Sequence, residues 1–212
     1  MVLRDITWTE IPRTDTSIIP VGSLEQHGPH LPFETDTIIA ADVARAVGEK
    51  INALVAPAIP VGISDEHMDF QGTLSISAKT LTSLLSDISG SLKRHGFTKQ
   101  YIINAHGGNT PVLEKFGEKN KVPVFGTLGY IGKFDHAGEV ETSLMLYLKP
   151  DAVRTDKIRD FEFTVPKGRS WKTKDHTESG VIGCANKATK EKGRQYFETI
   201  VESILKQINK ID

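Results

Sequence analysis

Cysteine, long apolar runs and net charge are scarce in this chain, and each shortage excludes a class of protein. Its 212 residues include one cysteine, Cys184, so no disulfide forms within the chain, and a reducing compartment, the cytoplasm, is expected. No apolar run approaches the roughly 18 residues of a membrane-spanning helix, and residues 1–5 lack the pattern of a signal peptide. A net charge of -1 at pH 7 predicts neither a nucleic-acid nor a membrane partner.

The chain instead alternates strand-like and helix-like segments. Apolar runs with β-branched residues predict strands at residues 17–21, 53–59, 73–77, 100–104 and 122–128. Helical spacing of apolar residues predicts helices at residues 37–51, 80–95, 110–119, 139–148 and 189–208. This alternation is typical of βαβ units, so we expect one α/β domain over residues 1–212, a three-layer α/β/α sandwich with a parallel or mixed central sheet. The irregular, charged residues 154–175 predict a loop or a short edge hairpin.

Chemically reactive side chains gather in the loops that follow the predicted strands. These loops are residues 23–36, 62–72, 105–109 and 129–141. In a parallel sheet, ligands bind at the carboxyl ends of the strands, where such loops converge. We therefore expect the four loops to surround one site.

The loop after the first strand places two carboxylates and two imidazoles within twelve residues, 25–36. Glu25 and His27 are two residues apart, so in an extended backbone they point the same way. Asp36 stands where a helix begins, in the position of an N-cap. Such charges at the end of a buried strand favour a divalent metal. The alternative is that Asp36 only caps the helix while Glu25 and His27 lie at the surface.

Two later loops add candidates to the same sheet edge. Residues 106–109 read His-Gly-Gly-Asn after a buried strand, and the glycines permit a tight turn that presents His106 at the strand end. Glu141 falls in the first turn of a predicted helix, where an anion is stabilised and can face a cation. His136, just before that helix, is a candidate proton carrier. The alternative for Glu141 is a helix-end charge with no metal contact.

Taken together, these motifs resemble the signatures of the creatininase (creatinine amidohydrolase) family. The matching stretches are Val21-Gly-Ser-Leu-Glu-Gln-His-Gly-Pro-His-Leu-Pro32, Asn104-Ala-His-Gly-Gly-Asn109 and His136-Ala-Gly-Glu-Val-Glu-Thr-Ser143. Supporting matches lie within residues 62–73 and 179–193. The resemblance implies a three-layer α/β/α fold around two divalent metal ions, and a homo-oligomer, often a hexamer.

The resemblance also implies roles for particular residues. Glu25, Asp36 and His106 would bind one metal ion, while His27 and Asp36 would bind the second, with Asp36 bridging. The ions would be Zn²⁺, Mn²⁺ or Fe²⁺, which all suit such ligands. Water acidified by them would attack an amide carbonyl, and His136 would carry a proton to the leaving nitrogen.

The chain departs from creatininase itself at several positions. Creatininase has a tyrosine and a metal-binding glutamate where this chain has Gly107 and Gly108, so Glu141 becomes the candidate for the missing ligand and a further catalytic residue. Creatininase also has tryptophans near its substrate loop that this chain lacks. This difference makes creatinine a less favoured candidate substrate.

Four more residues receive expectations around this site. We expect His67, Asp135 and Asn109 to contact the substrate, although His67 could instead face a neighbouring subunit or solvent. We expect His30 to orient a metal ligand by donating a hydrogen bond to a carboxylate, and the alternative is that it binds a metal ion itself.

The sequence thus predicts a metal-dependent hydrolase of an amide C–N bond in a creatinine-like cyclic amide or a related small amide. A short peptide end is another candidate substrate. A second alternative is a deformylase of a formylamino-pyrimidine nucleotide in flavin and deazaflavin biosynthesis, with Lys133, Lys167 and Arg169 as the available basic groups. A non-catalytic metal-binding protein is the alternative from another class. A flavodoxin-like nucleotide-binding module is disfavoured because an acid stands where its phosphate loop would lie.

Overall fold

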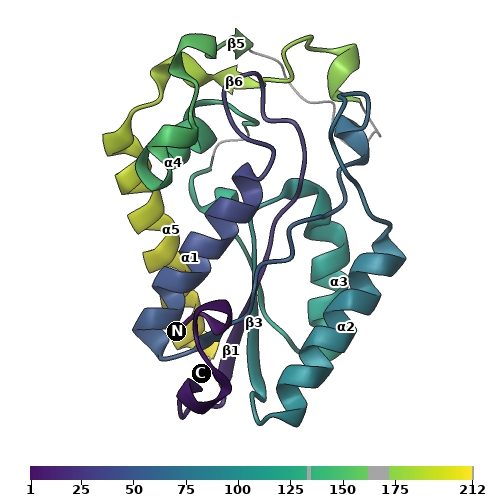
Figure 1. The fold of residues 1–212 in the computed structure, drawn as a ribbon, viewed down its shortest axis with the longest axis vertical. Helices are drawn as coiled ribbons and strands as arrows, with labels where there is room; N and C mark the ends of the chain where they lie inside the picture. Colours follow the sequence, from purple (N-terminus) through teal and green to yellow (C-terminus); the bar gives the residue numbers. More distant parts are fainter. Residues whose placement is uncertain (133–134, 162–171, 212) are drawn as a thin grey trace.

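A four-stranded parallel sheet forms the middle layer of the molecule (Figure 1). The computed structural model describes residues 1–132, 135–161 and 172–211. The strands are β1 (Thr16–Val21), β2 (Leu54–Val55), β3 (Lys99–Asn104) and β4 (Val124–Gly126), in the order β2-β1-β3-β4. The two central strands, β1 and β3, are in register from Thr16 opposite Lys99 to Val21 opposite Asn104. Of the two sheet types expected, the parallel one is observed.

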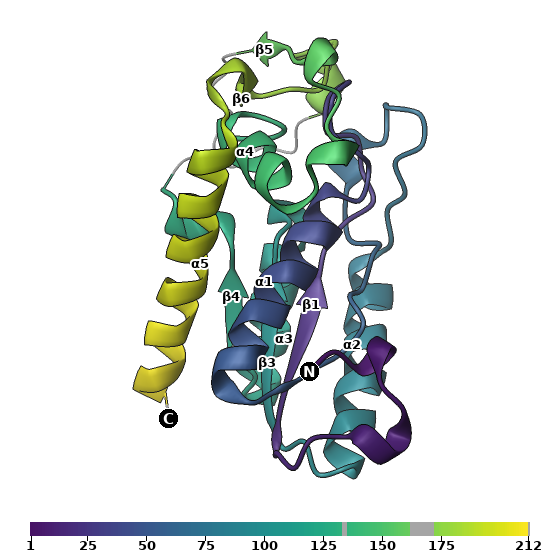
Figure 2. The same ribbon diagram turned by 60° about the vertical axis from the view of Figure 1, so that its left-hand side comes forward.

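Helices cover both faces of this sheet, as Figures 1 and 2 show. One face carries α1 (Thr35–Ile51), α4 (Glu139–Leu148) and α5 (Lys190–Ile211). The other carries α2 (Ala78–Arg94) and α3 (Thr110–Asn120). The three-layer α/β/α prediction is therefore confirmed. None of the helices in the described ranges is long and apolar enough to cross a bilayer.

Alternating side chains of the central strands build two separate cores. Ile18 and Ile103 pack with the buried faces of α1, α4 and α5, whereas Ile19 and Ile102 pack against α2 and α3. Strands buried on both faces read as continuous apolar runs, which explains why they could be located in the sequence. Burying one such side chain contributes about 1.5–3 kcal/mol, so the two cores hold the sheet edge in place.

Local sequence signals set the ends of the helices. The Ser77 side chain accepts a hydrogen bond of 3.1 Å from the backbone N–H of Thr80 and caps α2. Asn52 ends α1 in the left-handed conformation, at φ 52°, which asparagine tolerates well. All five helix predictions are confirmed within a few residues at each end.

The strand predictions need three corrections. Residues 73–77 are not a strand, because Leu74 forms only an isolated bridge with Leu24, away from the main sheet. The strands predicted at 53–59 and 122–128 shrink to the short β2 and β4. Within residues 154–175 there is a strand, β5 (Asp160–Phe161), but it pairs with β6 (Gly183–Cys184) rather than within a hairpin of its own. Residues 162–171 lie outside the described residues.

Candidate metal centre

A cavity of about 600 Å³ lies at the carboxyl ends of the sheet strands. Residues from all four loops that follow the predicted strands line it, so their convergence is confirmed. Among the lining residues are Glu25, Asp36, Glu66, His106, Asp135 and Glu141. No lysine or arginine is found among the described residues that line the cavity.

Glu25, Asp36 and His106 form a first group of buried side chains whose ligand atoms all lie within 4.8 Å of one another. The Nδ1 atom of His106 lies 3.2 Å from Glu25 Oε1 and 3.1 Å from Asp36 Oδ2. The Nε2 atom of His106 donates to the backbone carbonyl of Ile63 at 2.7 Å, because a carbonyl can only accept. This bond orients the ring so that Nδ1 faces the two carboxylates.

His27, Asp36 and Glu141 form a second group within the same limit. The Nε2 atom of His27 lies 3.2 Å from Asp36 Oδ1 and 3.7 Å from Glu141 Oε2. Its Nδ1 atom donates to the backbone carbonyl of Glu25 at 3.1 Å, so this ring too is oriented by a main-chain acceptor. Asp36 belongs to both groups, with one carboxylate oxygen facing each histidine.

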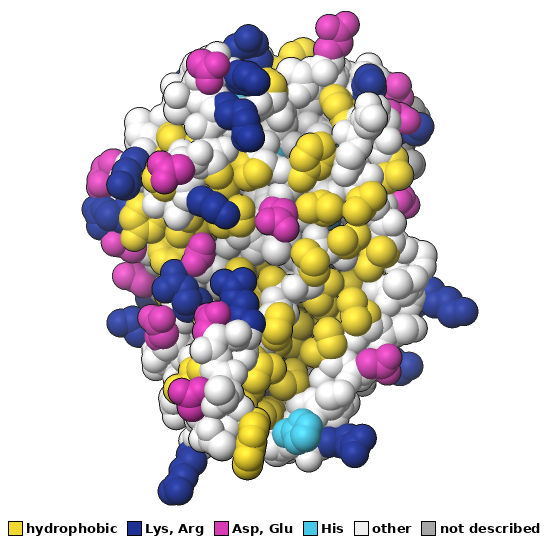
Figure 3. Space-filling view, in the orientation of Figure 1, with side chains coloured by type: hydrophobic (Ala, Val, Ile, Leu, Met, Phe, Trp, Pro, Cys, Tyr) yellow, Lys and Arg dark blue, Asp and Glu magenta, His cyan; other side chains and the backbone are white. Residues whose placement is uncertain are grey.

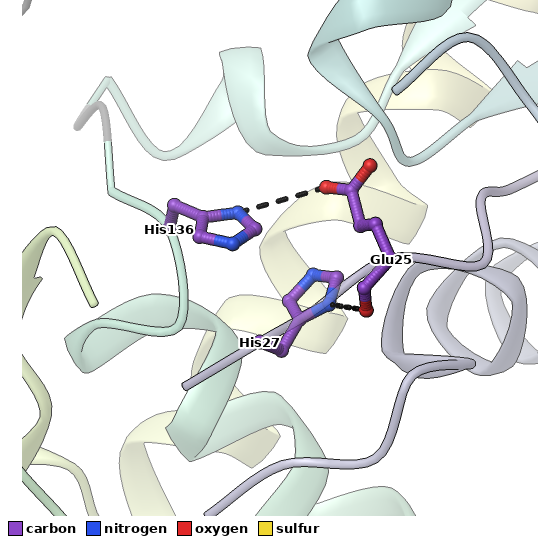
Figure 4. A group of neighbouring side chains, drawn as sticks. All are labelled: Glu25, His27 and His136. Carbon is purple, nitrogen blue, oxygen red and sulfur yellow. Dashed lines mark hydrogen bonds and ion pairs between the residues drawn. The ribbon is translucent and has the colours of Figure 1, made fainter. Parts of the chain in front are cut away.

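His136 completes a third group with Glu25 and His27 (Figure 4). Its Nδ1 atom lies 3.7 Å from Glu25 Oε1, and its ring stacks on that of His67 with centroids 4.2 Å apart. The sequence predicts a proton carrier at His136, and the structure also places its ring among the possible metal ligands. The geometry brings it to the centre in either role.

Gln26 is a residue that the sequence reasoning missed, and it holds two of these histidines. Its side-chain Nε2 lies 2.9 Å from His67 Nδ1 and 2.9 Å from His136 Nε2, and its backbone carbonyl accepts from His136 Nε2 at 2.8 Å. Since a carbonyl only accepts, the proton of neutral His136 sits on Nε2 and its Nδ1 lone pair faces Glu25. In the sequence, only the position of Gln26 between Glu25 and His27 indicates that it lies near the site.

Glu25 provides the test of whether a cation fits this site. Its side chain is fully buried, and neither carboxylate oxygen has a hydrogen-bond partner among the described residues. A buried carboxylate without hydrogen bonds is unfavourable unless a positive charge compensates it. Imidazole nitrogens and carboxylate oxygens in closed groups of three are also the ligands that Zn²⁺, Mn²⁺ and Fe²⁺ accept. The residues present therefore fit a divalent metal.

In the protein alone, protonated histidines balance the buried carboxylates. Burial disfavours the charged form of His27, but the Asp36 carboxylate outweighs it and raises the pKa of His27 to about 10. The pKa of His106 is raised well above its ordinary value, because Glu25 and Asp36 outweigh burial. Burial likewise opposes the charge of Glu25, yet the charged His106 beside it lowers the pKa of Glu25 to about 2. A cation in the centre would take over this balancing role.

Other groups of the centre are held neutral. Burial lowers the pKa of His67 to about 4 and, together with the neighbouring His67 and His27, lowers that of His136 well below its ordinary value. Burial raises the pKa of Glu141 well above that of a free carboxyl, and its Oε2 accepts a 2.5 Å hydrogen bond from the Ala137 backbone N–H. His136 is thus a neutral base at pH 7.

Of the three residues expected to contact the substrate, two line the cavity and one does not. His67 and Asp135 line the cavity, although Asp135 Oδ2 also accepts from the backbone N–H of Val140 at 2.7 Å, in the first turn of α4. Asn109 is fully buried and is not among the lining residues. Its side chain instead accepts from Ile63 N–H at 2.9 Å and donates to the Gly22 carbonyl at 2.9 Å, which ties two of the loops together.

Two local expectations are wrong. His30 does not donate to a carboxylate, since its Nε2 lies 2.9 Å from Thr142 Oγ1. Asp36 is not an N-cap, because α1 begins at Thr35 and Asp36 lies in the first turn. Its carboxylate is therefore available to the centre, and Ser23 Oγ donates to it at 2.8 Å.

Overlapping groups of carboxylates and imidazoles at the carboxyl edge of an α/β/α sheet define a candidate metalloenzyme. Residues 4–208 match the family model described as Creatininase: Creatinine amidohydrolase, so the chain belongs to the creatininase family. It is 35% identical to the mycofactocin precursor peptide peptidase of Mycobacterium tuberculosis, over 97% of this chain and 90% of that protein. It is 28% identical to the creatinine amidohydrolase of Pseudomonas putida, over 94% and 93% of the two chains. The solved structure named Creatininase Mn superposes with a TM-score of 0.89 at 27% identity, covering 99% of this chain and 97% of that one.

Proposed function

We propose that the chain is a metal-dependent amidohydrolase that cleaves an amide C–N bond at this cavity. The observation that carries the proposal is the pair of ligand groups that share Asp36, beside a Glu25 carboxylate that is buried without a hydrogen bond. Membership of a family whose members are named as hydrolases supports it.

Each ligand group would hold one divalent ion. Glu25, Asp36 and His106 would hold the first, and His27, Asp36 and Glu141 would hold the second. Ions bound there supply an acidified water and polarise the amide carbonyl. Zn²⁺, Mn²⁺ and Fe²⁺ suit the ligand set equally, because selection among them follows availability more than affinity.

The chain's own residues would move the proton. His136 is neutral at pH 7, with its Nδ1 lone pair directed at the centre and its Nε2 proton engaged by the Gln26 carbonyl. A neutral imidazole in this position can take a proton from the attacking water and deliver it to the leaving nitrogen. The backbone carbonyl of Gln26 keeps the ring in the tautomer that this transfer needs.

The substrate would be a small amide, either cyclic like creatinine or the amide at a peptide end. The higher identity to a relative named a peptidase favours the peptide end over creatinine. A nucleotide substrate would need cations for its phosphate. The basic residues considered for that purpose, Lys133, Lys167 and Arg169, lie outside the described residues, and the described lining has no lysine or arginine.

A substrate screen tests the proposal. Protein loaded with Mn²⁺ or Zn²⁺ would be assayed with creatinine, other cyclic amides, formamides and short peptides, beside Asp36→Asn and a matched control, Asp87→Asn, from the exposed side of α2. We expect metal-dependent hydrolysis in at least one class, lost in Asp36→Asn and kept in the control. Protein that binds metal and turns over no amide would instead be a non-catalytic metal-binding protein.

We also propose that the protein acts as a cytoplasmic homo-oligomer, a hexamer by family resemblance. Hydrophobic side chains gather over the centre of the face in Figure 3, while charged ones crowd its left margin, the side where Figure 1 shows α4 and α5. A groove of about 530 Å³ beside α1 is lined by apolar residues, including Ile38, Ala41, Val55 and Pro57, and by charged residues of both signs. A second copy is the occupant we propose for this surface. Light scattering after size exclusion would report a single 23.3 kDa chain if the proposal fails.

A further inference from the structure

Glu66 is a carboxylate of the cavity that belongs to neither ligand group. It lies in the short 3-10 helix Asp65–His67, in the loop after β2, and lines the cavity together with Glu25 and His106. The Glu66 residue is half-buried, so its side chain is partly withdrawn from water. Among the described residues, no other residue forms a hydrogen bond or ion pair with its side chain.

The turn at Gly107 and Gly108 runs beside Glu66 and lines the same cavity. A Cβ at Gly108 would lie 3.2 Å from Glu66 Oε1 and 2.5 Å from His106 Nε2, and it would collide with the Ile63 carbonyl oxygen, so the backbone itself approaches Glu66 closely there. A Cβ at Gly107 would meet no described atom within 4 Å, so the cavity in front of Gly107 has room for a ligand.

Each of the other carboxylates that line the cavity either belongs to a proposed metal site or accepts a hydrogen bond. Glu25, Asp36 and Glu141 belong to the ligand groups, whose charge two divalent ions would neutralise. Asp135 accepts a hydrogen bond from the first turn of α4. No lysine or arginine among the described lining residues faces Glu66. The Glu66 carboxylate is therefore a negative charge at the cavity wall that a bound substrate could contact.

We infer that Glu66 is a specificity-determining residue whose carboxylate binds a cationic, N–H-rich group of the substrate, such as an ammonium or a guanidinium. The inference rests on the proposed function, since it assumes that the substrate occupies this cavity. An ion pair in a partly buried cavity is stronger than one at the surface, and a guanidinium can donate two parallel hydrogen bonds to one carboxylate. Glu66 would select the substrate by charge while the metal centre acts on its amide.

Binding of two probes of the same shape tests this role. Methylguanidinium and neutral methylurea would be titrated calorimetrically into metal-loaded wild-type protein, Glu66→Gln and Glu114→Gln. The last variant is a matched control, because Glu114 is an exposed carboxylate of α3. We expect wild type and the control to bind methylguanidinium at least tenfold more tightly than methylurea, a difference of about 1.4 kcal/mol. We expect Glu66→Gln to bind the two probes equally.

Three results would overturn the inference. They are the absence of any preference in wild type, a preference that survives in Glu66→Gln, and loss of a metal ion from Glu66→Gln, which would make Glu66 a ligand. Thermal unfolding of each variant verifies that it is folded. The amide screen is independent of these titrations: a charge preference that depends on Glu66 in a protein that hydrolyses no amide would reject the proposed reaction and keep the binding role.

Discussion

His27 and His106 are the residues at which metal and proton compete. Each ring donates one nitrogen to a backbone carbonyl and turns the other toward carboxylates. Those carboxylates raise the pKa of His27 to about 10 and that of His106 well above its ordinary value. In the protein alone, both rings therefore carry an extra proton at pH 7, on the nitrogen that a metal would need.

Metal binding at pH 7 should accordingly release protons, one from each of these rings and one from the neutral carboxyl group of Glu141. The sign follows from the raised pKa: below it the proton occupies the ligand nitrogen, so metal affinity should increase as the pH rises toward 10. Calorimetric titration with Mn²⁺ in buffers of different ionisation enthalpy measures the number released. A binding heat that does not depend on the buffer would contradict the assignment, and His27→Asn should release one proton fewer.

Gln26 is a positioning residue in this account, because it acts through His67 and His136. Replacing it with leucine removes the side-chain amide that lies against both rings, while the backbone carbonyl that accepts from His136 and a side chain of similar size remain. We expect kcat to fall about 10–100-fold, the usual effect of losing a residue that orients a functional histidine, with the metal content unchanged. Metal analysis beside steady-state kinetics on a substrate from the screen checks this, and Gln195→Leu on exposed α5 is the control. An unchanged kcat would remove Gln26 from the mechanism.

At the scale of elements, the turn from β3 into α3 holds the first ligand group in place. Gly107 and Gly108 are neighbours with opposite surroundings, since a side chain would meet open space at the first and the Ile63 carbonyl and His106 at the second. The close approach at Gly108 is what allows His106 to bond to the Ile63 carbonyl.

The two glycines therefore make a matched pair of alanine variants. Gly108→Ala should displace Ile63 or His106 and weaken metal binding at least tenfold, because the bond that orients His106 is lost. Gly107→Ala should bind metal like wild type. Titration with Zn²⁺ compares the two, and equal affinities would show that this close approach does not matter for the centre.

Features that one residue type or one hydrophobic period indicates can be predicted from the sequence. The buried strands were readable as apolar runs, and His106 was readable because Gly107 and Gly108 follow it. Prediction fails where a contact joins distant segments. No sequence feature near Gln26 indicates that its side chain reaches His67 and His136. Residues 73–77 have the sequence pattern of a strand, although Leu74 pairs only with Leu24 in a loop. The bond from Asn109 to Ile63 is equally invisible until the loops are assembled.

At the scale of the whole molecule, the metal centre joins loops from both halves of the chain. Glu25 and Asp36 come from around β1 and the start of α1, His106 follows β3, and Glu141 lies in α4. An ion held between them links the two central strands of the sheet to α1 and α4. Metal binding should therefore stabilise the fold as a unit.

Chelation should lower the melting temperature of the protein. A ligand present at a hundred times its Kd stabilises the folded state by about 2.7 kcal/mol, which corresponds to roughly 5–10 °C for a chain of this size. Scanning calorimetry with and without a chelator, followed by added Mn²⁺, measures the shift and its reversal. In Asp36→Asn the shift should vanish. A wild-type melting temperature that does not change when the chelator is added would contradict a stabilising role of the metal.

Two divalent ions that share Asp36 should be visible in the metal content of the protein. Wild type, Asp36→Asn and the control Asp87→Asn would be equilibrated with micromolar Mn²⁺ or Zn²⁺, freed of unbound ions and analysed for metal per chain. The account predicts about two ions in wild type and in the control, and fewer than one in Asp36→Asn, because both ligand groups lose their common member. Folded wild type that holds no metal, or Asp36→Asn that keeps both ions, would contradict it.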